Sequence, residues 1–300
     1  MDLIEYSNNP NDQVTPFGLV NIGGTCWFNS LLQCLLSCPS FNQTIINNYN
    51  KFIRTKNYLG LELYKLINST SLYNPRNLYM TFINYMKNNK MSIQDIYRVQ
   101  GDPNEGFLKL LECLNCNDID ELFEIRFKTY IICGNCKYKS KENIETGFHT
   151  ELFSDNTDDN YLNNPKDFAR KIICQINDQS DYRCDKCNQM HENTKYVYRL
   201  LRIPTIFPVL LNKYNRSNNI NYPLEFTMSY KDNIRKLYFK LVSVATHSGN
   251  LSGGHHYSHG LRNINNNDTF YLFNDSYVRV DDKFNKKNTY FTFYHFDKLK

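Results

Sequence analysis

The ten residues 21–30 read NIGGTCWFNS, and this stretch decides how the rest of the chain is interpreted. Apolar residues recur at helical spacing after the two glycines, so residues 25–37 are expected to form an amphipathic helix. Cys26 then opens that helix. A helix N-terminus concentrates unpaired N–H groups and partial positive charge, which are expected to lower the pKa of the Cys26 thiol. The position therefore suits a nucleophile.

A nucleophilic role for Cys26 requires a base elsewhere, because a cysteine at such a position is more often a small buried residue. Residues 253–257 read GGHHY, and residues 270–275 read FYLFND. A thiol nucleophile is served by an imidazole whose other nitrogen is held by an amide or a carboxylate. The spacing suits a histidine at the end of one strand and Asn274 or Asp275 at the end of the next. Position alone selects none of the seven histidines.

Four motifs, in matching order, carry a resemblance to the ubiquitin-specific proteases: the cysteine box at residues 18–33, the central strand at 208–214, a His-x-Gly at 247–249, and the histidine box at 254–257 with 273–278. Their order and separation make the resemblance specific. It implies that Cys26 is the nucleophile, that His256 is the general base and that Asn274 orients it. It further implies that Asn21 helps to form the oxyanion hole and that Asp275 is a supporting polar residue.

The chain departs from the family pattern at three places. His255 competes with His256 for the role of base, and the histidine directly before Tyr257 is preferred. The orienting position is more often Asp, where this chain has Asn274. The family's helix usually carries Asp-Ala-x-Glu-Phe-Leu, whereas residues 103–108 read PNEGFL, so both acidic positions are altered.

Six of the ten cysteines form CxxC pairs, at Cys113/Cys116, Cys133/Cys136 and Cys184/Cys187. Spacing alone favours the first two pairs as a zinc site, because their gap falls within the usual range of about 15–20 residues. Context favours the second and third pairs, which have turn-forming centres, whereas the first pair closes an apolar helical face. The resemblance agrees, since the family's fingers carry CxxC…CxxC. One structural zinc ion is therefore expected on the second and third pairs.

The order of elements predicts an α+β fold, with helices first and strands later. Helices are expected at about residues 58–90 and 104–114. Strands are expected at residues 123–132, 196–201, 209–214, 238–246, 270–273 and 290–296. Residues 133–195 have little hydrophobic periodicity and are expected to be an insertion held by something other than a core.

The resemblance implies a papain-like cysteine protease fold with a helical thumb, a β-rich palm and a zinc-stapled fingers insertion. The catalytic domain would cover residues 16–300. Residues 16–121 would form the thumb, residues 122–200 mostly the fingers, and residues 201–300 the palm.

Composition indicates a globular protein in a reducing compartment. Of its 300 residues, 41% are hydrophobic and 22% are charged. Residues 1–12 have no basic region followed by an apolar core, so no secretory signal is predicted. No apolar run approaches the roughly 20 residues that span a bilayer. We expect a monomer without a membrane partner in the cytoplasm or nucleus, or in the host cytoplasm if the source is a virus.

The predicted function is a deubiquitinating thiol protease that cuts the peptide or isopeptide bond after the C-terminal glycine of ubiquitin. Its partners would be ubiquitin and ubiquitinated proteins. The first alternative is a ubiquitin-binding module of the same fold with weak or no catalysis. The second is a zinc-ribbon nucleic-acid binder, which acidic residues in the insertion disfavour. These are Asp155, Asp158, Asp159, Asp178, Asp181 and Asp185.

Overall fold

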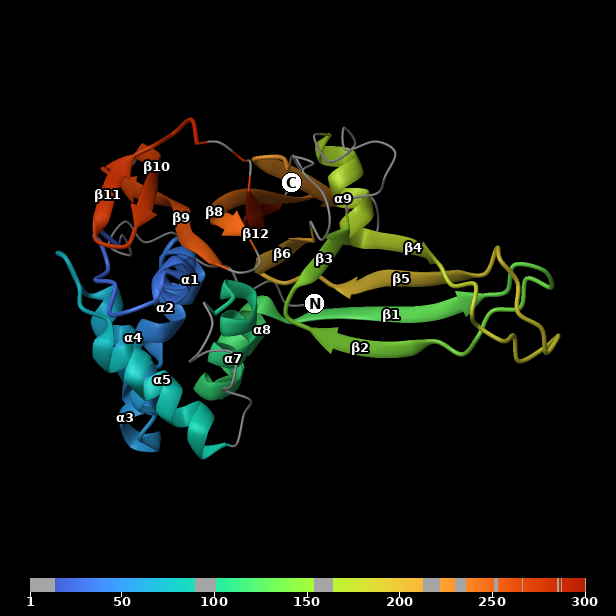
Figure 1. Ribbon diagram of the computed structural model, residues 1–300, viewed down its shortest axis with the longest axis horizontal. Coiled ribbons are helices and arrows are strands. Elements are labelled where there is room, and N and C mark those ends of the chain that lie inside the picture. Colours follow the sequence, from blue (N-terminus) through green and yellow to red (C-terminus); the bar gives the residue numbers. More distant parts are fainter. Residues whose placement is uncertain are drawn as a thin grey trace.

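The computed structural model describes residues 14–89, 101–153, 164–212, 222–229, 236–250, 253–265, 267–284, 286 and 288–299. Helices occupy the first part of the chain and strands the rest, as Figure 1 shows. The expected α+β class is confirmed. Within the described ranges, none of the helices has the length and apolar character needed to cross a membrane.

The helical part contains α1 (Cys26–Leu36), α2 (Pro39–Asn47), α3 (Tyr49–Thr55), α4 (Tyr58–Ile67), α5 (Arg76–Asn88), α7 (Pro103–Leu114) and α8 (Asn117–Phe123). The single helix expected over residues 58–90 is two helices, and its last residue, Lys90, lies outside the described residues. Pro75 is the N-cap of α5. A proline disfavours helical backbone in the residue before it and has no N–H to donate, so a single helix cannot run through this position.

Helix α1 lies between the other helices and the larger sheet, and all eleven of its residues are buried. It contacts α7 on one side and strands β8 (Lys236–Asn250) and β9 (Gly253–Ile264) on the other. Its aromatic and leucine side chains join one large apolar cluster with the other helices. Removing that surface from water stabilises the fold.

The larger sheet contains β3 (Thr150–Phe153), β6 (Ile206–Asn212), β7 (Glu225–Ser229), β8, β9, β10 (Asn267–Asn274), β11 (Tyr277–Val280) and β12 (Thr289–Leu299). Its order is β11-β10-β9-β8-β12-β6-β3, with β7 paired to β8. Residues 213 and 214 of the expected strand 209–214 lie outside the described residues. Strand β9 pairs with both β8 and β10 in antiparallel register, so the histidine strand has Asn274 at the end of its neighbour.

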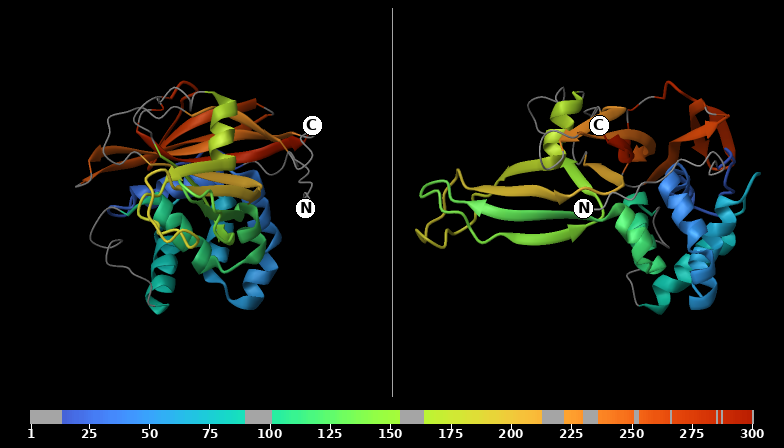
Figure 2. Two further views of the ribbon diagram at one scale, coloured as in Figure 1. Left: turned by 90° about the vertical axis from the view of Figure 1, so that its right-hand side faces the viewer. Right: turned by 180° about the vertical axis from the view of Figure 1, so that it is seen from behind.

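A smaller sheet forms an arm that projects from the body, as Figures 1 and 2 show. Its order is β2-β1-β5-β4, from β1 (Ile125–Ile132), β2 (Asn143–Gly147), β4 (Cys174–Asp178) and β5 (Lys195–Arg202). At its base, α9 (Pro165–Ile173) buries Phe168, Ala169 and Ile172 against the larger sheet. The stretch 133–195 was expected to be an insertion held by something other than a core, which is wrong for α9. Phe168, Ala169 and Ile172 stand at helical spacing, but a helix of nine residues offers too few repeats for the pattern to be recognised.

Candidate active site

Cys26 is the first residue of α1, and only 2% of its surface is exposed. The turn before it contains Gly23 and Gly24, whose φ angles of 110° and 67° lie in the left-handed region that favours glycine. This turn directs the chain into the helix immediately before Cys26. The sequence-based placement of the thiol at a helix start agrees with the structure.

Burial is the main influence on the Cys26 thiol and raises its pKa above the usual value. The backbone N–H groups of His256 and Trp27 oppose this by hydrogen bonding to the sulfur, while the Asp275 carboxylate adds to the rise. The expected lowering of the pKa is therefore wrong for the free protein. A thiolate loses its water shell in a buried site, and this cost outweighs the stabilisation that the helix N-terminus gives to the thiolate.

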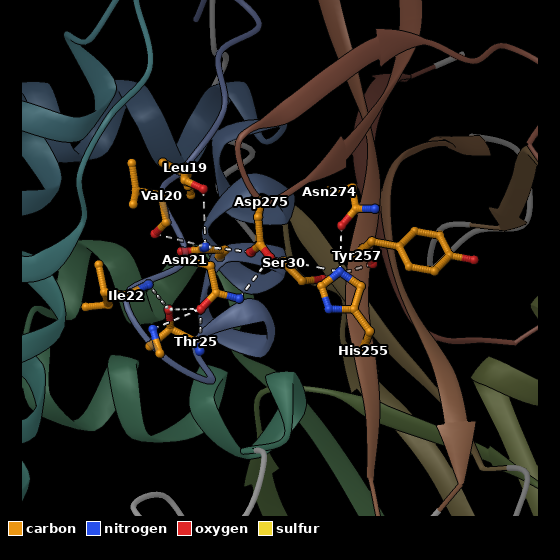
Figure 3. A network of polar contacts seen from close by, with 12 residues as sticks. Leu19, Val20, Asn21, Ile22, Thr25, Ser30, His255, Tyr257, Asn274 and Asp275 are labelled. Carbon is orange, nitrogen blue, oxygen red and sulfur yellow. Dashed lines mark hydrogen bonds and ion pairs between the residues drawn. The ribbon is translucent and has the colours of Figure 1, made fainter.

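Asn21 is held at both ends of its side-chain amide, as Figure 3 shows. Its Oδ1 accepts the backbone N–H of Gly23 at 3.0 Å and that of Thr25 at 3.3 Å. Its Nδ2 donates to Asp275 Oδ2 at 2.9 Å. Because an amide nitrogen has two hydrogens, one N–H stays available to a substrate oxygen. Asn21 thus has a fixed orientation and a spare donor.

Asp275 braces the segment that carries Asn21. Its second carboxylate oxygen, Oδ1, accepts from Asn29 Nδ2 at 2.8 Å, and its backbone carbonyl accepts the N–H of Leu19 at 2.9 Å. Asp275 has φ 52° in the turn after β10, which aims its side chain back at α1. Sequence reasoning missed Asn29. Asn29 stands three residues after Cys26 and so lies on the same face of the helix, but nothing in the sequence indicated its partner.

His255 is the histidine that meets Asn274. Its Nε2 lies 2.5 Å from Asn274 Oδ1, and the same nitrogen is 3.9 Å from Asp275 Oδ2. The His255 side chain is 41% exposed, so a substrate could reach it. A ring N–H at Nε2 donates to the amide oxygen, and this leaves Nδ1 as the basic nitrogen.

His256 lies on the opposite face of β9 and is 6% exposed. Its Nδ1 is 3.4 Å from the Tyr290 hydroxyl, and its ring stacks on His247 with the centroids 4.6 Å apart. Burial lowers the pKa of His256 to about 3, with His247 and His255 adding to the shift. The expected pairing of His256 with Asn274 is therefore corrected to His255. Consecutive side chains of a strand point to opposite faces, so only one of the two can meet Asn274.

Trp27 fills the space beside Gly106, one of the two altered positions in residues 103–108. A Cβ built on Gly106 would lie 2.4 Å from a carbon of the Trp27 ring, and one on Gly101 would lie 2.5 Å from it. The indole thus leaves no room for a side chain at position 106. Asp102 precedes the altered stretch and caps α7, accepting the N–H groups of Asn104 and Glu105 at 2.8 and 3.0 Å.

Four cysteine sulfurs gather at the far end of the arm. The sulfurs of Cys133, Cys136, Cys184 and Cys187 all lie within 4.8 Å of one another. Cys133 is 3.8 Å from Cys187, and Cys136 is 3.6 Å from Cys184. Four sulfurs around tetrahedral zinc, each about 2.3 Å from the ion, are separated by about 3.8 Å. The donor set and its geometry fit a closed metal site.

The two CxxC turns have matching backbones. The residue after each second cysteine, Lys137 or Asn188, has a positive φ of 58° or 54°. Asp155, Asp158 and Asp159, which contributed to the acidity expected of the insertion, lie outside the described residues.

The alternative zinc pairing, which spacing alone favoured, is wrong. Cys113 and Cys116 are 4% and 2% exposed and pack in the helical cluster of the body. Across the described ranges, the four arm cysteines are the only gathered set of metal-ligating side chains. Tertiary packing thus separates the first CxxC pair from the second.

Comparisons with known proteins agree with this architecture. Residues 17–294 match the ubiquitin carboxyl-terminal hydrolase family. Ubiquitin carboxyl-terminal hydrolase 36 of Drosophila pseudoobscura pseudoobscura is 24% identical over 324 residues, covering 93% of this chain and 29% of that protein. The chain therefore spans less than a third of this curated relative. Inactive ubiquitin-specific protease 5 of Oryza sativa subsp. japonica is 38% identical over 55 residues, or 18% of this chain and 14% of that protein.

Among solved structures, the SAGA DUB module containing Ubp8, bound to monoubiquitin, matches with a TM-score of 0.73. The sequence identity is 18%, and the match covers 96% of this chain and 71% of that chain. The expected papain-like fold of the ubiquitin-specific proteases is confirmed.

Proposed function

The chain belongs to the ubiquitin carboxyl-terminal hydrolase family, and on that premise we propose that it is a thiol protease that removes ubiquitin from proteins. The observation that carries the proposal is the convergence of three segments at one place. They bring the Cys26 thiol, the His255–Asn274 pair and the braced amide of Asn21 to the same end of α1.

His255 takes the role of general base that the resemblance assigned to His256. With Nε2 held by Asn274, Nδ1 accepts the Cys26 proton, and the thiolate attacks the carbonyl carbon of ubiquitin's terminal glycine. The tetrahedral intermediate collapses when the lysine nitrogen takes that proton from His255 and leaves. Water then attacks the thioester, gives a proton to His255 and frees the ubiquitin carboxylate, while the thiol is restored.

Asn21 supplies a donor for the oxyanion of the tetrahedral intermediate. Its free N–H is aimed before substrate arrives, because Asp275 holds the other N–H and two backbone amides hold its oxygen. A donor placed in advance stabilises developing charge without reorganisation. Asp275 is therefore a positioning residue, which refines its expected supporting role.

The four arm cysteines hold one zinc ion with a structural role. With all four positions taken by sulfur, the ion stabilises the arm and has no site open to water or substrate. The arm and its base correspond to the fingers expected at residues 122–200, between a thumb at 16–121 and a palm at 201–300. Ubiquitin is the ligand named for the Ubp8 structure. We propose that the fingers hold its globular part and that the enzyme is a monomer. The thiolate and the zinc thiolates both need a reducing compartment such as cytoplasm or nucleus.

A second candidate is a ubiquitin-binding module that does not turn over substrate. The motif-level likeness to a rice protein named as inactive is the observation that favours it. The two candidates differ in whether Cys26 reacts.

The test is labelling with ubiquitin that carries an electrophile at its C-terminus, followed by hydrolysis of ubiquitin fused to a fluorogenic amine. We expect wild type and Cys174→Ala, which alters a thiol in β4 of the arm, to be labelled and Cys26→Ala to be inert. An unlabelled wild-type protein that still binds ubiquitin would favour the second candidate. Labelling that survives in Cys26→Ala would contradict both the nucleophile and the mechanism.

A further inference from the structure

The proposed mechanism leaves His256 without a role, although it is a buried histidine beside the nucleophile. The structure holds its ring from two sides. The Tyr290 hydroxyl is 3.4 Å from Nδ1, and the ring of His247 stacks on it at 4.6 Å with an interplanar angle of 31°. Tyr290 also meets the His256 ring edge to face, with centroids 5.9 Å apart. The ring therefore has little freedom to turn.

The Tyr290 hydroxyl links this ring to the helical half of the molecule. It donates its hydrogen to the Asp102 carboxylate, which also caps α7. Since a hydroxyl has one hydrogen, its oxygen then accepts a hydrogen bond from an N–H at His256 Nδ1. The chain Asp102, Tyr290, His256 connects α7, β12 and β9, and it fixes a neutral tautomer of the imidazole.

The backbone of His256 faces α1. The register between β9 and β10 ends at Ser258, and β9 also contacts α1. The Ser30 hydroxyl donates to the Tyr257 carbonyl at 3.1 Å. A backbone hydrogen bond from His256 favours the thiolate of Cys26 and so lowers the pKa of that thiol. The end of β9 is thus attached to the nucleophile's helix at two successive residues.

We propose that His256 is a positioning residue for the nucleophile. Its anchored ring holds the end of β9 in place, so that its backbone N–H stays directed at the Cys26 sulfur. The two adjacent histidines then divide the work: the side chain of His255 moves the proton, and the main chain of His256 stabilises the thiolate. This rests on the proposed function only in taking Cys26 as the reacting thiol.

An N–H donor favours the thiolate over the thiol and so lowers the pKa of the cysteine. Several other groups also act on this thiol or on the ring that anchors the N–H: Asp275, His255, His247, Asp102 and Tyr290. None of the variants below adds or removes a net charge at neutral pH. A change in thiol reactivity would then report the loss of positioning.

The experiment measures the rate at which iodoacetamide alkylates Cys26 from pH 6 to 10, by mass spectrometry of the Cys26 peptide. The thiolate forms an S–C bond and iodide leaves, so the profile gives the apparent pKa without ubiquitin. We expect His256→Ala to raise that pKa by about one unit, a tenfold lower thiolate fraction at neutral pH. His256→Phe, which keeps the ring stacking and loses the Tyr290 bond, should restore part of the difference.

The matched control is His259→Phe, on the same strand. His259 is 4% exposed, and its Nε2 lies 3.2 Å from Asp281 Oδ2. Its profile should equal that of wild type. If His256→Ala does not fold, Tyr290→Phe removes only the hydroxyl anchor and should raise the apparent pKa by a smaller amount.

Two results would overturn the proposal. One is an unchanged alkylation pKa in a folded His256→Ala or, failing that, in Tyr290→Phe. The other is a His256→Phe variant that loses ubiquitin hydrolysis as completely as His255→Ala, which would make His256 the base. A wild-type protein that never hydrolyses ubiquitin but shows the expected alkylation shift would contradict the proposed function alone.

Discussion

The active-site end of α1 and the tip of the arm both depend on cysteine, but they are built in opposite ways. Cys26 is a single cysteine in a buried site, and the groups around it are backbone N–H donors, amides and histidines. The arm cysteines face one another, with exposed neighbours such as Asn135 and Asp185 and little apolar burial around them.

The difference shows that the surroundings of a thiol decide its chemistry. A packed core can hold one sulfur at a chosen distance from a base and a donor, so the sulfur can react. An arm tip without a core gains order when a metal draws four sulfurs together, and this consumes their reactivity. Four sets of substitutions test whether the two regions are separate in this sense, and they follow in order of their expected effect on hydrolysis.

The largest effect after loss of the nucleophile is expected from His255→Ala. Hydrolysis of a ubiquitin fluorogenic substrate should fall by about 10²–10⁴-fold, because general acid–base catalysis is removed. Zinc content should stay at that of wild type, since the arm is untouched. Steady-state kinetics and metal analysis check both. A fall of less than fivefold would contradict the assignment of His255 as base.

Asn21→Ala should lower kcat by about 10²–10³-fold with little change in KM, because an oxyanion donor acts mainly in the transition state. Asp275→Asn should lower it less, since the amide could keep one of the two contacts. The comparison of kcat with KM is the measurement. If Asp275→Asn lowers kcat more than Asn21→Ala does, Asp275 acts directly on His255 in addition to bracing Asn21.

Cys184→Ser should separate the two regions. We expect zinc stoichiometry to fall from one toward zero and hydrogen exchange to rise at residues 133–140 and 184–195, because metal binding contributes the order of the tip. Hydrolysis of a short C-terminal ubiquitin peptide should change little. The control is Cys113→Ser, in the body, which should keep zinc. Retention of zinc by Cys184→Ser would contradict the pairing.

Gly106→Ala should affect stability with the smallest effect on rate. The added Cβ meets the Trp27 ring at 2.4 Å, so the free energy of unfolding should fall by about 1–3 kcal/mol through overpacking. Gly147→Ala in the arm is the matched control, because its Cβ would have its nearest neighbour at 3.5 Å. Urea denaturation measures both. If Gly106→Ala and Gly147→Ala lost the same free energy of unfolding, α7 would have to shift to admit the added methyl group.

Much of the fold could be predicted from local sequence, and the errors share one cause. The helix at α1 and the strands β1, β5, β8, β10 and β12 follow from periodicity over a few residues. The break between α4 and α5 and the buried face of α9 were missed. Asn29 was missed as well, because its partner Asp275 lies 246 residues away.

The sequence by itself determined the chemical inventory of this protein: a thiol at a helix start, histidines and an Asn-Asp pair in the family's order, and three CxxC pairs. Only the tertiary structure decided which members act together. Adjacent strand residues face opposite ways, so the pairing of β9 with β10 selects His255 for Asn274 and leaves His256 to Tyr290. Likewise, burial of Cys113 in the helical core leaves the arm's two turns to meet. Contacts between distant segments decide both pairings, because the preferences of short stretches of chain carry no information about such contacts.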